Sequence, residues 1–526
     1  MADPVVDTQF VAGTVITSPW LNGVNDFVND AINQTDYTKG AARIGFDNTT
    51  LTAFIRTSTD KVVASLTELR AVDKTKYTQA YVSALNGGGL YLYDNSDVIS
   101  TDNGGTIIVA SDGGRWKLTH TDLIDVTVFG AKGDGSTDDF DAITDAITAL
   151  LALPTGGVLY FPGGRNYLTS AQLQFPKTID KRIILEGFGA KISRHGSYTG
   201  SLAYFGEPVN LTSAPPVRVY GLTFAGPYLT PSVDPLVELQ NSNGTIFIDC
   251  QFQSGTVGCI LESSFAVSYH RCHFGNQSSF GLEMTTLCMQ LMTFDCQFID
   301  ISVGSSGVAL QFEAAALNVV VRDCDMEGGN SAMNFVLGGS NVLIDGCYIE
   351  GYTGVPIFAS AAMNAFNVCN SWIGYNPGAQ IWGNIKTGRL HNCIMENQQS
   401  TVDTTCEHFI IGNVDYRGTS NKTFTRMIPI TLINGFSNTG GVWANAAWIK
   451  DEFDEVSFVG MVQAAGDNAC FILPVGFRPT KQLSFACIAA NRSPAQVVVF
   501  PDGSVTCYRG TDTTIDLAPV RFRVQQ

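Results

Sequence analysis

Lysine is missing from a long central part of this 526-residue sequence. None stands between Lys191 and Lys386, where only four arginines occur. The whole chain has a formal net charge of −17, which repels polyanions such as DNA and RNA. The sequence therefore argues against a nucleic-acid partner. We also do not expect the central part to hold a ligand rich in carboxylates or phosphates by ion pairing.

Long apolar runs are absent as well. No run approaches the roughly 18 residues of a membrane-spanning helix, so we expect no membrane insertion. The first ten residues, MADPVVDTQF, show no basic region followed by an apolar stretch. No secretion signal is therefore expected at this start.

The 13 cysteines include no CxxC pair and no zinc-finger spacing. From them we predict neither a metal site nor a cofactor. We expect the thiols to be reduced and mostly buried, where cysteine packs as a small apolar residue. Reduced thiols fit assembly in a cytosol.

What the sequence does contain is a repeat, in which a small residue is followed two positions later by a large apolar one. The interval between repeats is 22 to 28 residues. The small position is occupied by Leu222, Cys250, Cys272, Cys296, Cys324, Cys347, Asn370 and Cys393. The large position is occupied by Phe224, Phe252, Phe274, Phe298, Met326, Ile349, Trp372 and Met395.

A period of two is typical of a strand with one buried face, and a repeat near 23 residues is typical of one coil of a solenoid. The LxxLxLxxN pattern of leucine-rich repeats is absent, and no helical period separates the strands. The repeat therefore predicts a parallel β-helix, in which like residues stack as ladders along the core. The cysteines would form one ladder and the large residues the next.

An amphipathic helix is predicted at residues 138–151, before the repeat. Phe140, Ile143, Ile147 and Leu150 make one apolar face, and Ser136 or Thr137 can act as the N-cap. Such a helix would close the open end of a solenoid. We assign the aspartates of GDGSTDD (133–139) to capping and turn formation.

The segments FGAKGDGSTDD, with its repeated AI pairs, and GGVLYFPGG resemble the first part of the pectate-lyase-like right-handed β-helix superfamily. Residues 87–118 alternate strand-like runs with Asp, Asn and Gly turns and predict hairpins; residues 18–34 form a short amphipathic segment. Together, and especially through NGGTIIVASDGGRW, these resemble the N-terminal virion-attachment region of tailspikes from short-tailed bacteriophages. The last hundred residues resemble the β-sandwich that closes many phage fibres and spikes.

These resemblances imply an all-β homotrimeric tailspike without a cofactor. Residues 1–122 would attach to a phage tail or adaptor protein. Residues 123–425 would form the β-helix that binds and cleaves a bacterial capsule or O-antigen polysaccharide. Residues 426–526 would form a β-sandwich for trimerisation or sugar binding. Such a protein is assembled in the host cytoplasm, belongs to the virion tail and acts at the host cell surface.

Glycoside hydrolysis needs two carboxyl groups that flank the bond. The position after the large apolar residue holds glutamate on three coils, at Glu327, Glu350 and Glu396. Glu327 and Glu350 are expected on adjacent coils, about 5 Å apart, close enough to raise one another's pKa. Glu350 and Glu396 are expected about 10 Å apart, nearer to the separation in inverting enzymes. The repeat allows either stereochemistry and slightly favours inversion.

Further acidic candidates are Asp325 and Asp345, beside the first set, and Glu262, Glu283 and Glu313, on the strand after each ladder strand. Glu327, Glu350 and Glu396 stand where a strand ends, and polar residues are also ordinary at turns. Aromatic candidates for binding the apolar faces of sugar rings are Tyr352, Trp372, Tyr375 and Trp382, although Trp372 also fits the core ladder. His270 and His391 are interpreted as structural residues of the repeat.

A polysaccharide lyase is the rival enzyme, since β-elimination needs a base and a cation to neutralise a uronate. The shortage of Lys and Arg in the central part makes hydrolysis the better hypothesis. A deacetylase is disfavoured because no GxSxG elbow is present. A spike that only binds glycan is the non-enzymatic alternative.

Overall fold

The chain divides into two compact units, Met1–Gly130 and Ala131–Gln526. The computed structural model describes residues 45–46, 49–50, 61–83, 89–119, 123–176, 181–206, 216–226, 234–286, 288–301, 306–374, 381–396, 408–412, 414–417, 428–450 and 454–524. The amphipathic segment predicted at 18–34 lies outside these residues. No helix within them has the length and apolar character needed to cross a bilayer.

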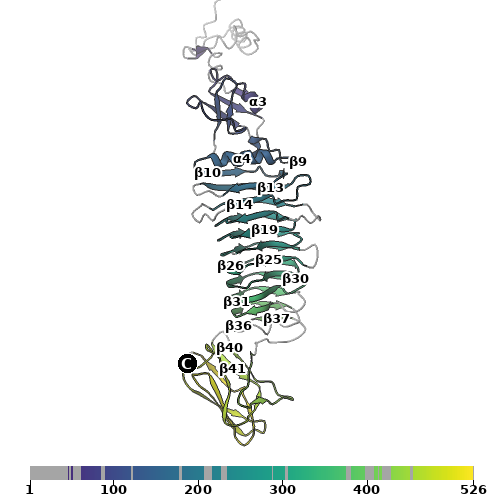
Figure 1. Cartoon of the computed structure of the whole chain (residues 1–526), viewed down its shortest axis with the longest axis vertical. Coiled ribbons are helices and arrows are strands. Elements are labelled where there is room, and N and C mark those ends of the chain that lie inside the picture. The colour runs from purple at the N-terminus through teal and green to yellow at the C-terminus, as the bar shows by residue number, and fades with distance from the viewer. Residues whose placement is uncertain are drawn as a thin grey trace, which may run out of the picture. The chain divides into compact units, whose positions relative to one another are not determined.

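The first unit, drawn in purple in Figure 1, contains a five-stranded sheet. Its strand order is β3, β4, β5, β7, β6. Its elements are β3 (Lys61–Val63), α3 (Leu66–Leu69), β4 (Gln79–Val82), β5 (Gly89–Asp94), β6 (Ile107–Val109) and β7 (Arg115–Leu118). The predicted hairpins are present, because β7 pairs antiparallel with both β5 and β6. Trp116 and Tyr91 are fully buried in its core, where the Tyr91 hydroxyl donates to the Gly105 carbonyl at 2.7 Å. Shorter elements of this unit are β1 (Gly45–Phe46), β2 (Thr49–Thr50), β8 (Leu123–Asp125) and η2 (Val126–Phe129).

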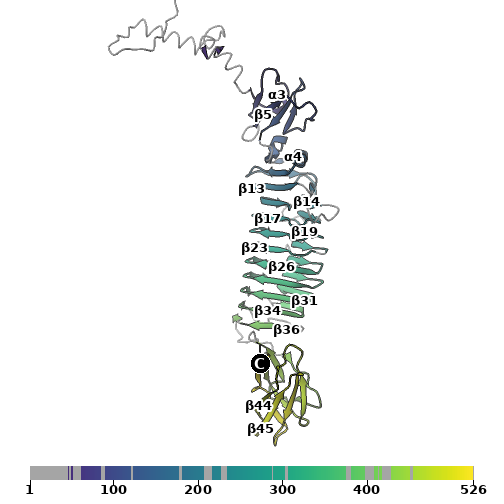
Figure 2. The same ribbon diagram turned by 90° about the vertical axis from the view of Figure 1, so that its left-hand side faces the viewer.

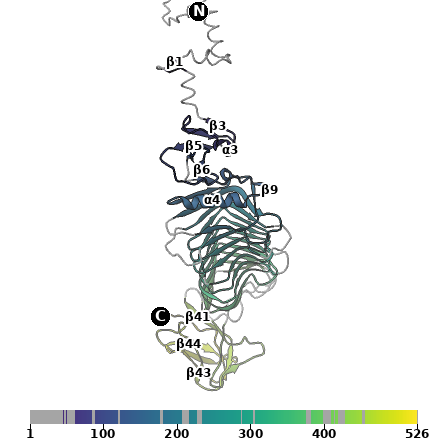
Figure 3. The same cartoon turned by 45° about the horizontal axis from the view of Figure 1, so that its top comes forward.

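The second unit begins with β9 (Asp134–Asp138) and α4 (Phe140–Ala152), which packs on the first strands of the stack (Figure 3). The predicted helix is present, but the predicted caps are wrong. Asp139 is the N-cap residue, and its buried carboxylate accepts hydrogen bonds from the backbone N–H groups of Lys132 at 2.6 Å and Gly133 at 3.0 Å. It therefore ties the preceding turn to the helix start and makes no side-chain cap.

Parallel strands then stack in three sheets, one strand of each sheet per coil (Figure 2). The first sheet contains β10 (Gly156–Tyr160), the first parts of β13 (Arg182–Arg194) and β15 (Arg218–Ala225), β17 (Ile246–Ile248), β20 (Ser268–His270), β23 (Met292–Phe294), β26 (Ala316–Arg322), β29 (Gly339–Asp345), the last part of β31 (Ile357–Cys369), β34 (Thr387–His391) and β36 (His408–Gly412). This is the parallel β-helix that the repeat predicted.

The second and third sheets complete each coil. The second sheet contains β11 (Asn166–Thr169), the last parts of β13 and β15, β18 (Gln251–Gln253), β21 (His273–Gly275), β24 (Gln297–Ile299), β27 (Asp325–Gly329), β30 (Tyr348–Tyr352), β32 (Trp372–Gly374), β35 (Ile394–Glu396) and β37 (Asp415–Arg417). The third contains β12 (Leu173–Pro176), β14 (Ala203–Gly206), β16 (Val237–Gln240), β19 (Val257–Glu262), β22 (Phe280–Met284), β25 (Val308–Phe312), β28 (Ser331–Phe335), the first part of β31 and β33 (Ile381–Ile385).

The predicted ladders run along the core. The rings of Phe252, Phe274 and Phe298 stack with centroid distances of 4.5 and 4.8 Å. The cysteines before them are buried, and each thiol donates to a carbonyl of the preceding coil, as Cys296 does to Tyr269 at 3.4 Å. All twelve cysteines in the described part of the chain are free thiols, eleven of them buried, as expected.

The predicted register fails on one coil. Trp372 pairs with Tyr348 and Ile394, whereas Ile373 occupies the core position between Ile349 and Met395. Ser371 consequently takes the place of a ladder cysteine; it is buried and accepts the Cys347 N–H at 3.1 Å. The ladder position after Cys347 is therefore Ser371 and not Asn370, which makes this coil one residue longer than the repeat predicted. Trp372 consequently faces outward instead of into the core.

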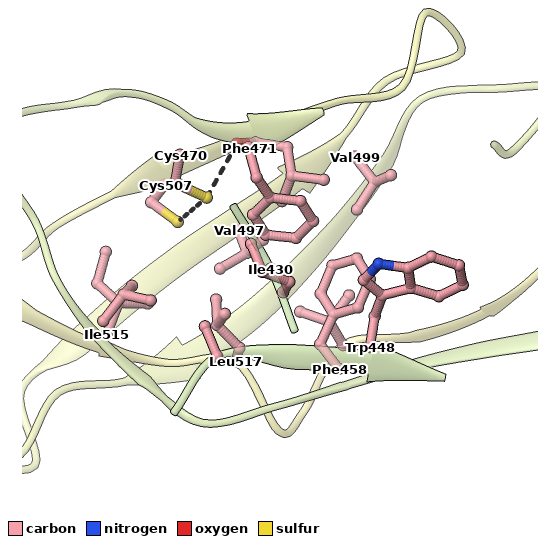
Figure 4. Packing of buried hydrophobic residues seen from close by; sticks show 14 of the residues in the cluster. Ile430, Trp448, Phe458, Cys470, Phe471, Val497, Val499, Cys507, Ile515 and Leu517 are labelled. Atoms are coloured by element: carbon pink, nitrogen blue, oxygen red, sulfur yellow. Dashed lines mark hydrogen bonds between the residues drawn. The ribbon is translucent and has the colours of Figure 1, made fainter. Parts of the chain in front are cut away.

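The C-terminal part of the second unit consists of antiparallel sheets around one hydrophobic core, which includes Trp448, Phe458 and Phe471 (Figure 4). Its strands are β38 (Ile428–Pro429), β39 (Ser437–Asn438), β40 (Ala447–Lys450), β41 (Glu455–Val459), β42 (Met461–Gln463), β43 (Asn468–Ile472), β44 (Leu483–Ile488), β45 (Pro494–Val499), β46 (Ser504–Tyr508), β47 (Thr514–Asp516) and β48 (Arg521–Arg523). The all-β fold class predicted from the sequence is confirmed in all of these parts.

Candidate active site

Carboxylates gather on the outer face of the second sheet. The strand register pairs Glu327 with Glu350, and Gly374 separates Glu350 from Glu396. Adjacent coils of such a sheet lie about 4.8 Å apart, so the predicted spacing of the three glutamates is confirmed at the level of the backbone. Asp325 lies two residues before Glu327 on the same strand and therefore points to the same side.

Crowding changes the acidity of this group. Burial, followed by repulsion from Asp325 and Glu350, raises the pKa of Glu327. Burial also raises the pKa of Asp325, helped by Glu350 and opposed by a hydrogen bond with Glu327. The Oδ1 atom of Asp325 is buried and accepts no hydrogen bond from the described residues. Asp325 and Glu327 thus form a pair that can retain a proton at a higher pH than ordinary carboxyl groups do.

An aromatic pair lies beside these acids. The ring of Tyr348 stacks on the indole of Trp372 with a centroid distance of 4.5 Å and an interplanar angle of 9°. The indole lies over Gly374, since a Cβ atom there would come within 2.5 Å of it. Hydrogen bonding to Glu350 raises the pKa of Tyr348 to about 12, so its hydroxyl stays protonated. The missing side chain at Gly374 therefore makes room for an aromatic surface next to Glu350.

One row of the second sheet carries much of this surface. It contains Gln251, His273, Gln297, Asp325, Tyr348, Trp372 and Ile394. Sequence reasoning missed Tyr348, although the alternation of strand residues around the buried Ile349 already places it outward. Its exposed fraction is 38%, which leaves part of the ring accessible.

Asp345 does not belong to the glutamate row but forms an ion pair and a hydrogen bond of its own. It ends β29 in the first sheet, where it pairs with the Arg322 guanidinium at 3.1 Å and accepts the Asn370 amide at 2.7 Å. The Asn370 hydrogen bond, with help from Arg322, holds the pKa of Asp345 below its usual range. A carboxylate kept ionised in this way stabilises the turn and is a poor proton donor.

The four aromatic residues predicted to bind sugar differ in where the structure places them. The prediction that Tyr352 binds sugar is wrong. Tyr352 is only 1% exposed and packs inside the coil. Trp372 is on the surface, as described above. Tyr375 lies outside the described residues, and Trp382 is placed only by its backbone, which pairs with Phe358.

The second acidic set lies on the third sheet. Glu262 and Glu283 are on adjacent coils as expected, but Glu283 pairs with Ile260 and so lies diagonally from Glu262. Burial, followed by repulsion from Glu313 and then Glu262, raises the pKa of Glu283.

The two histidines behave as structural residues where the structure describes them. His270 stacks on Phe294 with a centroid distance of 5.0 Å, and burial lowers its pKa. His391 ends β34 and pairs with Cys369. Within the described ranges, no three His, Cys, Asp or Glu side chains are arranged to hold a metal ion.

Comparisons with known proteins place this geometry in context. Residues 62–121 match a family described as the phage tail protein small four-stranded beta-sheet domain. Residues 123–200 match the family described as rhamnogalacturonase A/epimerase, pectate lyase-like. These matches fall on the first unit and on the start of the β-helix.

Curated relatives are tail proteins. The tail spike protein of Shigella phage Sf6 is 25% identical over 430 residues, which cover 74% of this chain and 62% of that protein. The Mu-like prophage FluMu defective tail fiber protein of Haemophilus influenzae is 30% identical over 198 residues, 35% of this chain and 30% of that protein. The chain thus spans about three fifths and three tenths of the lengths of these relatives.

A solved tailspike structure shares the fold. The tailspike protein gp49 of Acinetobacter baumannii bacteriophage Fri1, a capsular polysaccharide depolymerase, superposes with a TM-score of 0.51 at 13% identity, covering 88% of this chain and 95% of that one. Residues 62–121 are thus similar to a phage tail domain and residues 123–200 to a pectate-lyase-like segment, and the chain as a whole is similar to a phage tail spike protein and has the stacked-coil fold of a solved tailspike.

Proposed function

We propose that this protein is a phage tailspike that binds and depolymerises a bacterial surface polysaccharide, either a capsule or an O-antigen chain, by endo-glycoside hydrolysis. The supporting observation is the stacking of Glu327 on Glu350, with Asp325 beside them and the Tyr348–Trp372 pair next to them. Carboxyl pairs carry out glycoside hydrolysis, and aromatic rings bind the apolar faces of sugars.

In this proposal the protein is a homotrimer on the virion tail. Residues 1–122 attach it to a tail or adaptor protein, and the C-terminal sheets serve trimerisation or sugar binding. The β-helix of residues 123–425 carries the site. The protein is assembled in the host cytoplasm and acts on the polysaccharide at the host cell surface.

The carboxyl groups divide the chemistry between them. Glu327, whose pKa is raised by burial and by its acidic neighbours, protonates the glycosidic oxygen as the bond to the anomeric carbon breaks. Glu350 attacks that carbon from the other side, and water later releases the sugar. Adjacent coils place these two groups at about the 5–5.5 Å separation of retaining enzymes. This pair therefore predicts retention, and not the inversion that the wider pair of Glu350 and Glu396 favoured at the level of the sequence. Inversion, measured from the anomeric protons of the first product, would instead assign the chemistry to Glu350 and Glu396.

Hydrolysis is preferred over β-elimination because cations are scarce. Arg271 is paired with Asp249 at 2.7 Å, and Arg322 with Asp345 at 3.1 Å. Arg194 donates to the Gly200 carbonyl at 2.6 Å. Arg218, the fourth arginine of this part, is exposed on β15, four coils before Glu327. Little positive charge from these arginines therefore lies beside the candidate acids to neutralise a uronate carboxylate. An unsaturated product after incubation with host polysaccharide would establish a lyase instead.

The pH dependence of cleavage follows from the raised pKa of Glu327. A carboxyl group with a raised pKa keeps its proton to a higher pH, and a proton donor works only while protonated. We expect kcat to fall as the pH rises through that pKa. Asp325→Asn removes a neighbouring negative charge and should move the falling limb to lower pH. If the falling limb of the kcat–pH profile lies at the same pH in Asp325→Asn as in the wild type, Glu327 is not the proton donor.

The aromatic pair predicts a separate effect on binding. Replacing Trp372 by alanine removes the ring that stacks on Tyr348 and should raise KM on the order of ten-fold, with a smaller change in kcat. Tyr81→Ala is the matched control, because Tyr81 is also partly exposed, at 37%, but lies on β4 of the first unit. Equal KM values for the two variants would show that the pair does not bind substrate.

A further inference from the structure

A second polar surface lies on the outer face of the third sheet, on different strands from the candidate active site. In-register residues along it are Tyr204, Glu238, Ile260, Glu283, Gln311, Asn334 and Phe358. Beside this row, the Tyr204 hydroxyl donates to Gln240 at 2.7 Å, and the Gln240 amide donates to Glu262 at 3.1 Å. We call this set, with Glu313, the third-sheet surface.

The third-sheet surface contains hydrogen-bond acceptors that nothing in the described chain satisfies. Gln311 is only 4% exposed, and its amide nitrogen donates to Glu313 at 2.5 Å, which fixes the amide orientation. Its Oε1 atom then accepts no hydrogen bond from the described residues. The same is true of the buried Oδ1 atom of Asn334 on the next coil. Leaving buried acceptors unsatisfied costs free energy, so a pair of them favours a ligand that brings donors.

Charge narrows the class of ligand. Glu262, Glu283 and Glu313 contribute only acceptors when ionised, and no lysine occurs between Lys191 and Lys386. Burial raises the pKa of Glu283, helped by repulsion from Glu313 and Glu262. A uronate or phosphate group would be repelled by this surface. Hydroxyl and N–H groups would be bound by it.

The dimensions fit a chain and not an ion. Glu238 and Asn334 are separated by four coil spacings, or about 19 Å at about 4.8 Å each. No group of three acidic side chains in the described residues converges closely enough to bind a metal. A run of acceptors this long suits several consecutive sugar units.

We propose that the third-sheet surface is a second binding site for the polysaccharide, and that it takes a segment rich in hydroxyl and N–H donors and free of carboxylates. The inference rests on the proposed function, since the same polymer would occupy both sites. A polymer held at the second site is kept near the cutting site between cleavage events, because its effective concentration there is raised.

The test measures binding in the full-length Glu327→Gln protein, which keeps the polymer intact. The probe is a set of fluorescently labelled oligosaccharides prepared by partial acid hydrolysis of the surface polysaccharide from a susceptible host. Gln311→Met, which keeps the side-chain length and removes its polar atoms, should weaken binding about ten-fold relative to the parent. Glu283→Gln, which changes one atom of a half-buried side chain, should weaken it less. Asp145→Asn, on the exposed face of α4, is the control and should bind as the parent does.

The outcomes separate the two proposals. If wild-type protein cuts the polysaccharide while both third-sheet variants bind like their parent, the second site is overturned and the active site stands. If no cleavage occurs but binding still depends on Gln311 and Glu283, the depolymerase proposal fails and the second site stands. Oligogalacturonate is the anionic probe and should not bind; binding that is lost in Gln311→Met would overturn the assigned ligand class. If Gln311→Met fails to fold, the Glu283→Gln result decides.

Discussion

Glu327→Gln and Glu350→Gln should each lower kcat by about 10²–10⁴-fold, because each removes a carboxyl group that transfers a proton or attacks the sugar. Glutamine keeps the shape of the side chain, so folding should be preserved. The effect is expected to be large since the two residues pair directly across adjacent coils. Reducing ends released from host polysaccharide would measure it.

Asp323→Asn is the matched control for these two variants. Asp323 is exposed and lies two residues before Asp325, at a positive φ of 52° that asparagine adopts readily. This variant removes one nearby carboxylate without touching the candidate pair and should cut as the wild type does. Full activity in both glutamine variants would move the chemistry to Glu262, Glu283 and Glu313 or to another surface.

Phe252→Ala should lower the free energy of unfolding by about 3–5 kcal/mol, the usual cost of emptying a buried aromatic site. The Phe252 side chain is fully buried and stacks on Phe274 at 4.5 Å and on Phe224 at 5.6 Å. Removing it leaves a cavity that touches the coils on both sides. Denaturant unfolding followed by circular dichroism would measure the loss.

Gln251→Ala provides the control for this loss of stability. Gln251 precedes Phe252 on β18, but its side chain is exposed, so alanine there should change the free energy of unfolding by less than about 0.5 kcal/mol. Similar losses in the two variants would mean that the aromatic ladder is not the main source of cohesion in the coil stack.

The core of the β-helix was predictable because its physics is local. A strand with one buried face must alternate, and stacking like residues fills successive coils uniformly, so Cys296, Phe298 and their equivalents could be aligned without any structure. The same register correctly placed Glu327 on Glu350. On a strand whose side chains alternate, a glutamate that follows a buried core residue must point to the outer face.

Prediction failed where coil length changes. Aligning Asn370 with the ladder cysteines put Trp372 into the core row, one residue out of step, and a slip of one residue moves a side chain to the opposite face. The prediction for Tyr352 was wrong for a related reason. Tyr352 follows Gly351, whose φ of +72° interrupts the alternation of the strand, so the Tyr352 ring points inward. Helix caps, turns and buried acceptors such as Gln311 depend on contacts between coils, which spacing alone does not specify.

The most direct test of the account is to incubate purified wild-type protein with the surface polysaccharide of a susceptible host. Reducing ends and the ultraviolet absorbance of unsaturated uronates should be followed together. The account predicts that reducing ends accumulate without that absorbance, and that Glu327→Gln stops the release. Absorbance that rises with the reducing ends, or no release from that polysaccharide at all, would contradict glycoside hydrolysis by this site.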